Sequence, residues 1–127
     1  MHPIAVTAAV LAALIHLWFF AMESIWFLRE SVWRRFGLTS QDEAALVASF
    51  AYNQGFYNLF LAVGVAVGLT LVASGDPTSG RAVVLFACGS MVAAGVVLVL
   101  HSSAFLRAAA IQALPPLVAI LAVVAFG

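Results

Sequence analysis

Four long apolar runs dominate the chain, separated by short polar segments. The runs cover residues 4–28, 40–73, 81–103 and 107–126. An α-helix of about 20 apolar residues crosses the roughly 30 Å hydrocarbon core of a bilayer, and helices satisfy their own backbone groups there. The pattern therefore predicts an all-α fold in which residues 1–127 form a single transmembrane domain. This domain is expected to be an integral membrane four-helix bundle with both termini on the same side.

The polar segments carry signals for the ends of these helices. Ser40-Gln-Asp-Glu43 fits a capping box and predicts the start of the second helix. That helix is longer than a bilayer needs, so it must tilt or protrude. Residues 74–80 have the composition of a turn. Gly37 ends a short amphipathic segment whose apolar side chains are expected to rest on the membrane interface. Those side chains are Trp33, Phe36 and Leu38.

Composition agrees with a membrane protein and narrows its functions. The chain is 65% hydrophobic and 8% charged, against about 25% charged residues in a soluble domain. A formal net charge of zero offers no basic face for nucleic acid. The single cysteine, Cys88, excludes a disulfide framework. The first run is too long for a signal peptide and contains Glu23.

The arginines predict the orientation. Arg29, Arg34 and Arg35 lie in the first connection, and Arg107 lies in the third. The opposite side has only Arg81. Because basic residues are retained in the cytoplasm, the first and third connections are expected inside the cell and both termini outside.

Polar side chains occur at matching depths in the four runs. Counted from the outer ends at 1.5 Å per residue, one tier lies roughly 28–30 Å down. This tier comprises Glu23, Asn53 and His101. A second tier lies roughly 18–22 Å down and comprises His16, Asn58 and Gln112. Ionisable groups inside a span are costly, so such positions are functional candidates.

The second helix carries a broad polar arc at these depths. Asn53 and Tyr57 share a face, as do Gln54 and Asn58. The arc is expected to point into the bundle, since amides facing lipid would be unsatisfied, and Gly55 beside it permits close helix approach. The candidate ligand-binding or proton-relay residues are therefore His16, Glu23, Asn53, Gln54, Tyr57, Asn58 and Gln112.

Several chemistries do not fit these residues. The His-Glu-x-x-His pattern of metalloproteases and the Glu-x-x-His pattern of di-iron bundles do not occur, and His2, His16 and His101 lie at three depths. We therefore expect no metal and no cofactor. A carboxylate, an imidazole, a phenol and several amides remain, which can bind a polar head group, relay protons or catalyse acid–base chemistry. Whether the protein is an enzyme stays open.

Structural roles are the alternative for each of these residues. Buried amides and histidines often only hydrogen-bond helices together in membrane bundles. Glu23 near the interface can instead form a salt bridge with Arg29. His101, followed by two serines, is typical of an interfacial helix end.

Three segments resemble the signature of a known family. They are His16-Leu-Trp-Phe-Phe-Ala-Met-Glu23, Asn53-Gln-Gly-Phe-Tyr-Asn58 and Gln112-Ala-Leu-Pro115. In them the chain resembles, over nearly its whole length, the small four-helix membrane proteins described as domain of unknown function 1304. The resemblance implies that fold and a bacterial inner-membrane setting, and it implies no activity.

Three functions remain open. The first is a polar intramembrane pocket toward the cytoplasmic side that binds a small or lipidic ligand, with acid–base chemistry by Glu23 and His16 as a variant. The second is a proton-coupled small transporter acting as a homo-oligomer. The third is a structural or assembly partner of a membrane complex.

Overall fold

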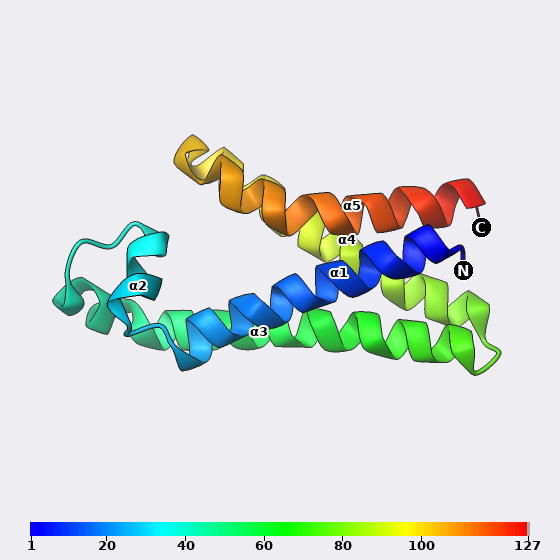
Figure 1. Ribbon diagram of the computed structural model, residues 1–127, viewed down its shortest axis with the longest axis horizontal. Coiled ribbons are helices and arrows are strands. Elements are labelled where there is room, and N and C mark those ends of the chain that lie inside the picture. Colours follow the sequence, from blue (N-terminus) through cyan, green and yellow to red (C-terminus); the bar gives the residue numbers. More distant parts are fainter. Residues whose placement is uncertain (127) are drawn as a thin grey trace. The chain divides into compact units, whose positions relative to one another are not determined.

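The computed structural model describes residues 1–126, all of whose regular elements are helical (Figure 1). In chain order the elements are α1 (Pro3–Phe20), η1 (Ala21–Ile25), α2 (Glu30–Trp33), η2 (Arg34–Phe36), α3 (Gln41–Ala73), α4 (Pro77–His101), η3 (Ser103–Phe105) and α5 (Leu106–Phe126). Four helical stretches in this part of the chain are long and apolar enough to cross a membrane. The predicted all-α class with four apolar helices is therefore confirmed.

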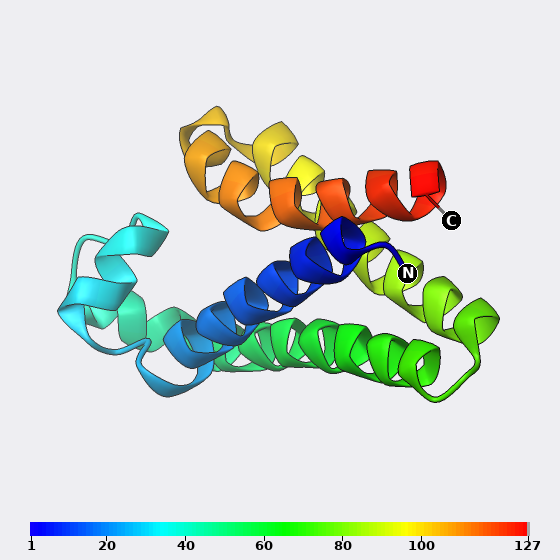
Figure 2. The same cartoon turned by 45° about the vertical axis from the view of Figure 1, so that its right-hand side comes forward.

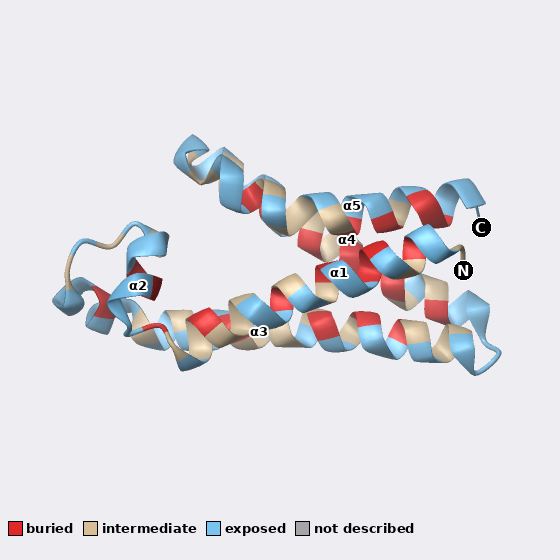
Figure 3. Cartoon of the chain, in the orientation of Figure 1, coloured by how far each residue is buried: buried red, intermediate tan, exposed pale blue. Residues whose placement is uncertain are grey.

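The chain divides into two compact units. Unit 1 comprises Met1–Ile15 and the described chain from Leu61 onward, and unit 2 comprises His16–Phe60. The long helices α1 and α3 each contribute one part to each unit. Only 22–28% of the most apolar part of each long helix is buried within the described chain (Figure 3), which is expected where outer faces contact lipid.

Unit 1 is a four-helix bundle with a core of small side chains. Segments of α1, α3, α4 and α5 surround this core, and α4 and α5 run side by side in both views (Figures 1 and 2). The core residues are Ala8, Ala9, Ala12, Val65, Val84, Ala87, Cys88, Met91 and Ala119. Small side chains let helix backbones approach closely, and close packing is what holds helices together in lipid.

Glycines set the closest approach in unit 1. A Cβ atom on Gly80 would lie 2.5 Å from the backbone oxygen of Gly68, and one on Gly68 would lie 2.9 Å from the oxygen of Gly80. A Cβ on Gly95 would lie 2.9 Å from the Cβ of Ala113. Helix α4 therefore packs against α3 and against α5 at distances that only glycine allows.

The turn before α4 is fixed by a capping aspartate. Gly75 adopts a φ of 97°, and the Asp76 side chain accepts a hydrogen bond from the Ser79 backbone N–H at 3.0 Å. Helix α4 consequently begins at Pro77, four residues before the expected Arg81, because proline at the first helical position loses no hydrogen bond. The hydrogen bonds from Ser79 hold the pKa of Asp76 below its usual value.

The two described ends of the chain meet in unit 1. The rings of His2 and Phe126 stack with centroids 4.5 Å apart. The start of α1 and the end of α5 therefore lie at the same end of this bundle (Figure 1).

Unit 2 is built on aromatic side chains and hydrogen bonds. Phe27, Trp33 and Ala44 form its core. The Trp33 indole N–H donates to Gln41 Oε1 at 2.9 Å, and Gln41 Nε2 donates to the Leu28 carbonyl at 3.2 Å. Trp33, which was expected to rest on the membrane interface, is instead packed within unit 2, where the residue is only 4% exposed. Burial packs the large apolar ring of Trp33 against other side chains, and the nearby acceptor keeps its indole N–H hydrogen-bonded.

The start of α3 is where the sequence predicts it. The Ser40 hydroxyl accepts a hydrogen bond from the Glu43 N–H at 3.1 Å, and α3 begins at Gln41. The Glu43 carboxylate accepts from the N–H and the hydroxyl of Thr39, at 2.8 and 2.9 Å. The capping contacts are therefore shifted by one residue from a standard capping box, in which the carboxylate would bind the Ser40 N–H.

Candidate functional site

A π-helical turn presents Glu23. Helix α1 passes into η1 (Ala21–Ile25), which closes with a hydrogen bond from the Trp26 N–H to the Ala21 carbonyl at 2.9 Å. Such turns are rare and occur often at functional sites. The extra residue in the turn changes which way the side chains after it point, and the Glu23 side chain is half-buried.

Gly55 brings α3 against this turn. A Cβ atom there would lie 2.0 Å from Ser24 Oγ and 3.1 Å from Glu23 Cβ. Ser24 Oγ donates to the Tyr52 carbonyl at 2.7 Å, one turn earlier on α3. The predicted role of Gly55, close helix approach, is confirmed. The residue that packs against it is Ser24, which follows Glu23 in the sequence.

Asn58 holds the Glu23 carboxylate from α3. Its Nδ2 donates toward Glu23 Oε1 at 3.3 Å and Oε2 at 3.4 Å, and toward the Gln54 carbonyl at 3.4 Å. Asn58 is 7% exposed. A carboxylate has about four lone-pair positions, so one amide group shared among three acceptors leaves Glu23 able to accept from a further donor.

A groove of about 350 Å³ opens beside Glu23, within unit 2. Its walls combine one carboxylate, one amide and six apolar side chains. The lining residues are Glu23, Phe27, Phe36, Leu38, Val47, Phe50, Ala51 and Gln54. Because the polar groups Glu23 and Gln54 occur together with phenylalanines, the groove matches a molecule with one polar group and an apolar body.

The polar arc predicted on α3 is divided by the structure. Asn58 is buried and faces Glu23, whereas Asn53, Gln54 and Tyr57 are exposed. The expectation that the whole arc points inward is therefore not met at those three positions. Successive helical residues are rotated by about 100°, so the turn that directs Asn58 at the carboxylate directs Asn53 and Tyr57 elsewhere.

The remaining candidates lie apart from this groove or in the other unit. His16 is fully buried, with its ring 5.6 Å from the Phe19 ring in an edge-on arrangement. Gln112 is half-buried in α5 of unit 1, and its approach to His16 and Asn58 stays a prediction. His101 is exposed at the end of α4, which agrees with an interfacial helix end.

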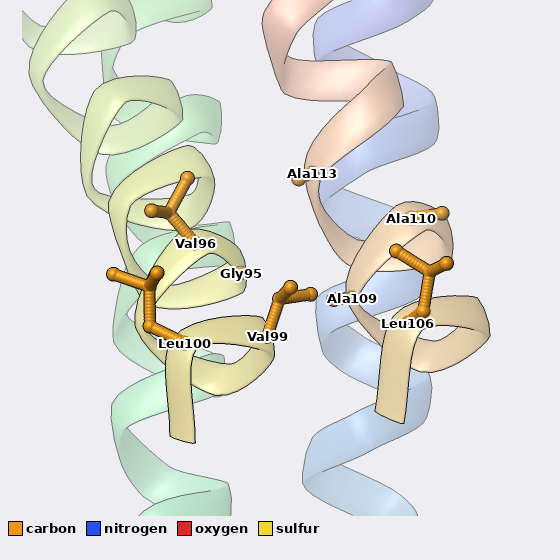
Figure 4. A pocket seen from close by; sticks show the side chains of 8 residues that line it. All are labelled: Gly95, Val96, Val99, Leu100, Leu106, Ala109, Ala110 and Ala113. Carbon is orange, nitrogen blue, oxygen red and sulfur yellow. The ribbon is translucent and has the colours of Figure 1, made fainter. Parts of the chain in front are cut away.

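A second cavity, in unit 1, has no such chemistry. It has a volume of about 250 Å³ and lies between the ends of α4 and α5 joined by η3. Figure 4 shows its lining, in which only aliphatic side chains and one glycine take part. These residues are Gly95, Val96, Val99, Leu100, Leu106, Ala109, Ala110 and Ala113. A wall of this kind can contact apolar groups and cannot recognise a polar one.

Sequence reasoning missed the apolar half of the groove. Phe27 and Phe50 were indistinguishable from other apolar residues of their runs, and Phe36 from an interfacial side chain. Ser24, one residue after Glu23 and with its hydroxyl bound to α3, was a polar residue in an apolar run and could have been noticed. Among residues 1–126, no group of three His, Cys, Asp or Glu side chains is placed to hold a metal.

Comparison with known proteins identifies a family and little more. A family model described as "Protein of unknown function (DUF1304)" matches residues 10–124. This range includes all of unit 2, most of unit 1 and every candidate ligand-binding or proton-relay residue named above. Comparison with curated proteins and with solved structures finds no match.

Proposed function

Since the chain belongs to this family of unknown function, we propose a function from its own site: unit 2 binds a small amphipathic ligand within the membrane. The polar end of the ligand meets Glu23, and its apolar body lies along the phenylalanines of the groove. The observation that carries the proposal is the Glu23–Asn58 pair at the groove. A half-buried carboxylate with one shared amide donor is an expensive way to join two helices, and binding of a ligand would give the carboxylate a role that packing does not require.

The test compares charge removal with side-chain removal. Glu23→Gln keeps the shape and hydrogen-bonding capacity of the side chain and is expected to insert and fold like the parent protein. We expect it to lose the small molecules or lipids that co-purify with the parent, measured by native mass spectrometry. Asp42→Asn removes one exposed charge from the first turn of α3 and is the control. Ligand retention by Glu23→Gln together with loss of stability in Glu23→Ala would assign Glu23 to helix packing instead.

An assembly role is a second candidate, supported by the face of α3 that carries Asn53 and Tyr57. Both side chains are exposed and lie one helical turn apart. Polar groups on a lipid-facing helix are satisfied when another helix covers them. Disulfide cross-linking of Asn53→Cys in native membranes, in a Cys88→Ala background, tests for a second copy. Ala66→Cys, which is exposed on α3 but about 140° around the helix from Asn53, is the control.

The membrane setting is part of the proposal. The chain is placed in the cell inner membrane with both termini outside, because four of its five arginines lie in the first and third connections. Helix α3 has 33 residues and α4 has 25, or about 50 Å and 37 Å. Helix α3 is therefore longer than the roughly 30 Å hydrocarbon core of a bilayer requires.

Cysteine labelling decides this orientation. Ser31 and Ser79 are exposed in the connections on opposite sides, and Ser31 is preferable to Ser40 because the Ser40 hydroxyl caps α3. In a Cys88→Ala background, a membrane-impermeant maleimide should label position 79 in intact cells and position 31 only after lysis. Labelling of position 31 from outside would reverse the orientation.

A further inference from the structure

In the described part of the chain, the groove in unit 2 is lined by one acidic side chain and by no basic one. Among the eight described residues that line it, Glu23 is the only charged one, and none is Arg, Lys or His. Asn58, which holds the carboxylate, is a neutral donor. A nearby positive charge favours the ionised form of a carboxylate, and the described lining of this groove supplies none.

Two of the three arginines in the first connection contact other side chains. The Arg34 guanidinium pairs with the Glu30 carboxylate at 2.6 Å and lies 5.4 Å from the centre of the Trp33 ring. The Arg29 guanidinium lies 5.3 Å from the centre of the Trp26 ring. Both side chains therefore have partners at the surface of the segment, and no described cation lines the groove beside Glu23.

Aromatic rings accompany this carboxylate. Phe27, Phe36 and Phe50 all line the groove. The Phe27 and Phe36 rings meet edge-on with centroids 5.5 Å apart, so the faces of two rings point in different directions. The face of an aromatic ring attracts a cation and repels an anion, and such rings also bury apolar groups.

Building on the binding function proposed above, we propose that this groove selects lipophilic cations: apolar molecules that carry one positive centre, such as a protonated or quaternary amine. The positive centre pairs with Glu23, and the apolar body contacts Phe27, Phe36 and Phe50. The Gln54 side chain lies at the same groove and can accept a hydrogen bond from an amine N–H. Anionic amphiphiles such as fatty acids are disfavoured by the same carboxylate.

A pair of probes of equal shape and opposite charge tests this selectivity. Tetraphenylphosphonium and tetraphenylborate are titrated into the purified full chain in neutral detergent, and binding is followed by tryptophan fluorescence. Glu23→Gln should weaken phosphonium binding by about tenfold, the size of one charge-assisted contact, and should leave borate binding equal or tighter. Asp42→Asn should change neither. Equal effects of Glu23→Gln on both probes would overturn the cation selectivity.

One further variant, compared with Glu23→Gln, separates this inference from the binding function. Val47 lines the groove from an exposed position, so Val47→Trp fills the groove without entering the core and should weaken both probes. If it does so while Glu23→Gln has no effect, the groove binds apolar molecules and only the charge selectivity fails. If neither variant changes any probe, both proposals fail.

If Glu23→Gln does not fold, the variant Gln54→Lys provides a second test of the proposed cation selectivity. Gln54 is exposed at the groove, where a lysine places a competing positive charge. This variant should exclude tetraphenylphosphonium and strengthen tetraphenylborate binding. Unchanged phosphonium affinity in a folded Gln54→Lys protein would contradict the proposal.

Discussion

The two units of this small chain are held together by different means. In unit 1 the described side-chain hydrogen bonds are local: Thr70, Ser74 and Ser90 donate to carbonyls of their own helices, and Asp76 caps α4. The helices there meet through alanine, valine and glycine. In unit 2, by contrast, side-chain bonds join separate segments, such as Asn58 to Glu23 across 35 residues.

This difference separates structural from functional polar groups. Lipid offers no hydrophobic drive for helix association, so a bundle is held by close contact or by hydrogen bonds. Unit 1 shows that close contact is sufficient in this chain, since its core has only small apolar residues and one methionine. The charged and amide groups of unit 2 are therefore more than the chain needs for packing, which is why we place the function there.

The largest effect should come from closing the glycine contact in unit 1. Gly80→Ala places a methyl group 2.5 Å from a backbone oxygen and 2.7 Å from the Val72 nitrogen, neither of which can move freely. We expect a loss of about 2–3 kcal/mol in stability, seen as a lower melting temperature in detergent. Gly89→Ala meets nothing within 4 Å in the described chain and should be neutral or stabilising. Equal melting of both variants would show that close contact does not hold unit 1.

Gly55→Ala should have a smaller effect on stability and a clear one on binding. The new methyl group would lie 2.0 Å from Ser24 Oγ, so the hydroxyl must leave the Tyr52 carbonyl. We expect a loss of about 1–2 kcal/mol and weaker probe binding at Glu23. Adding Ser24→Ala removes the nearest atom and should restore part of the loss, giving a non-additive double-mutant cycle. Additive effects would mean that Gly55 acts elsewhere.

Trp33→Phe tests whether hydrogen bonds matter in unit 2. The change keeps an aromatic ring and removes the indole N–H that donates to Gln41. The expected cost is about 1 kcal/mol, measured by thermal melting. Trp18→Phe, at a half-exposed ring, is the matched control and should be close to neutral. Equal small effects would weaken the contrast between the two units.

The smallest effect concerns the cap of α4. The native pKa of Asp76 is lowered by its bonds from Ser79, so its contribution is present above the unfolded-state pKa and is lost as pH falls through the native pKa. Between pH 5 and pH 3 the parent should therefore lose slightly more stability than Asp76→Asn, which keeps the capping group without titrating. Parallel melting curves for the two proteins would contradict this assignment.

The helices could be predicted from the sequence more accurately than the side chains that each helix buries. Long apolar runs and the serine cap predicted the four helices and the start of α3, because both signals are local. The π turn at Glu23 and the burial of Trp33 depend on contacts between segments, which no local pattern contains. The depth count placed Glu23 and Asn58 in different tiers, and it could not predict that the π turn directs Glu23 at Asn58.

The π turn also makes the register of Glu23 sensitive to chain length. Deleting Ala21 would allow the five-residue turn Ala21–Ile25 to close as ordinary α-helix. The chain after it would then rotate by about 100°, carrying the carboxylate off the face that meets Asn58. The helix and its hydropathy would survive such a deletion almost unchanged. In this short stretch, a gap of one residue between related chains therefore marks a change of site rather than a change of fold.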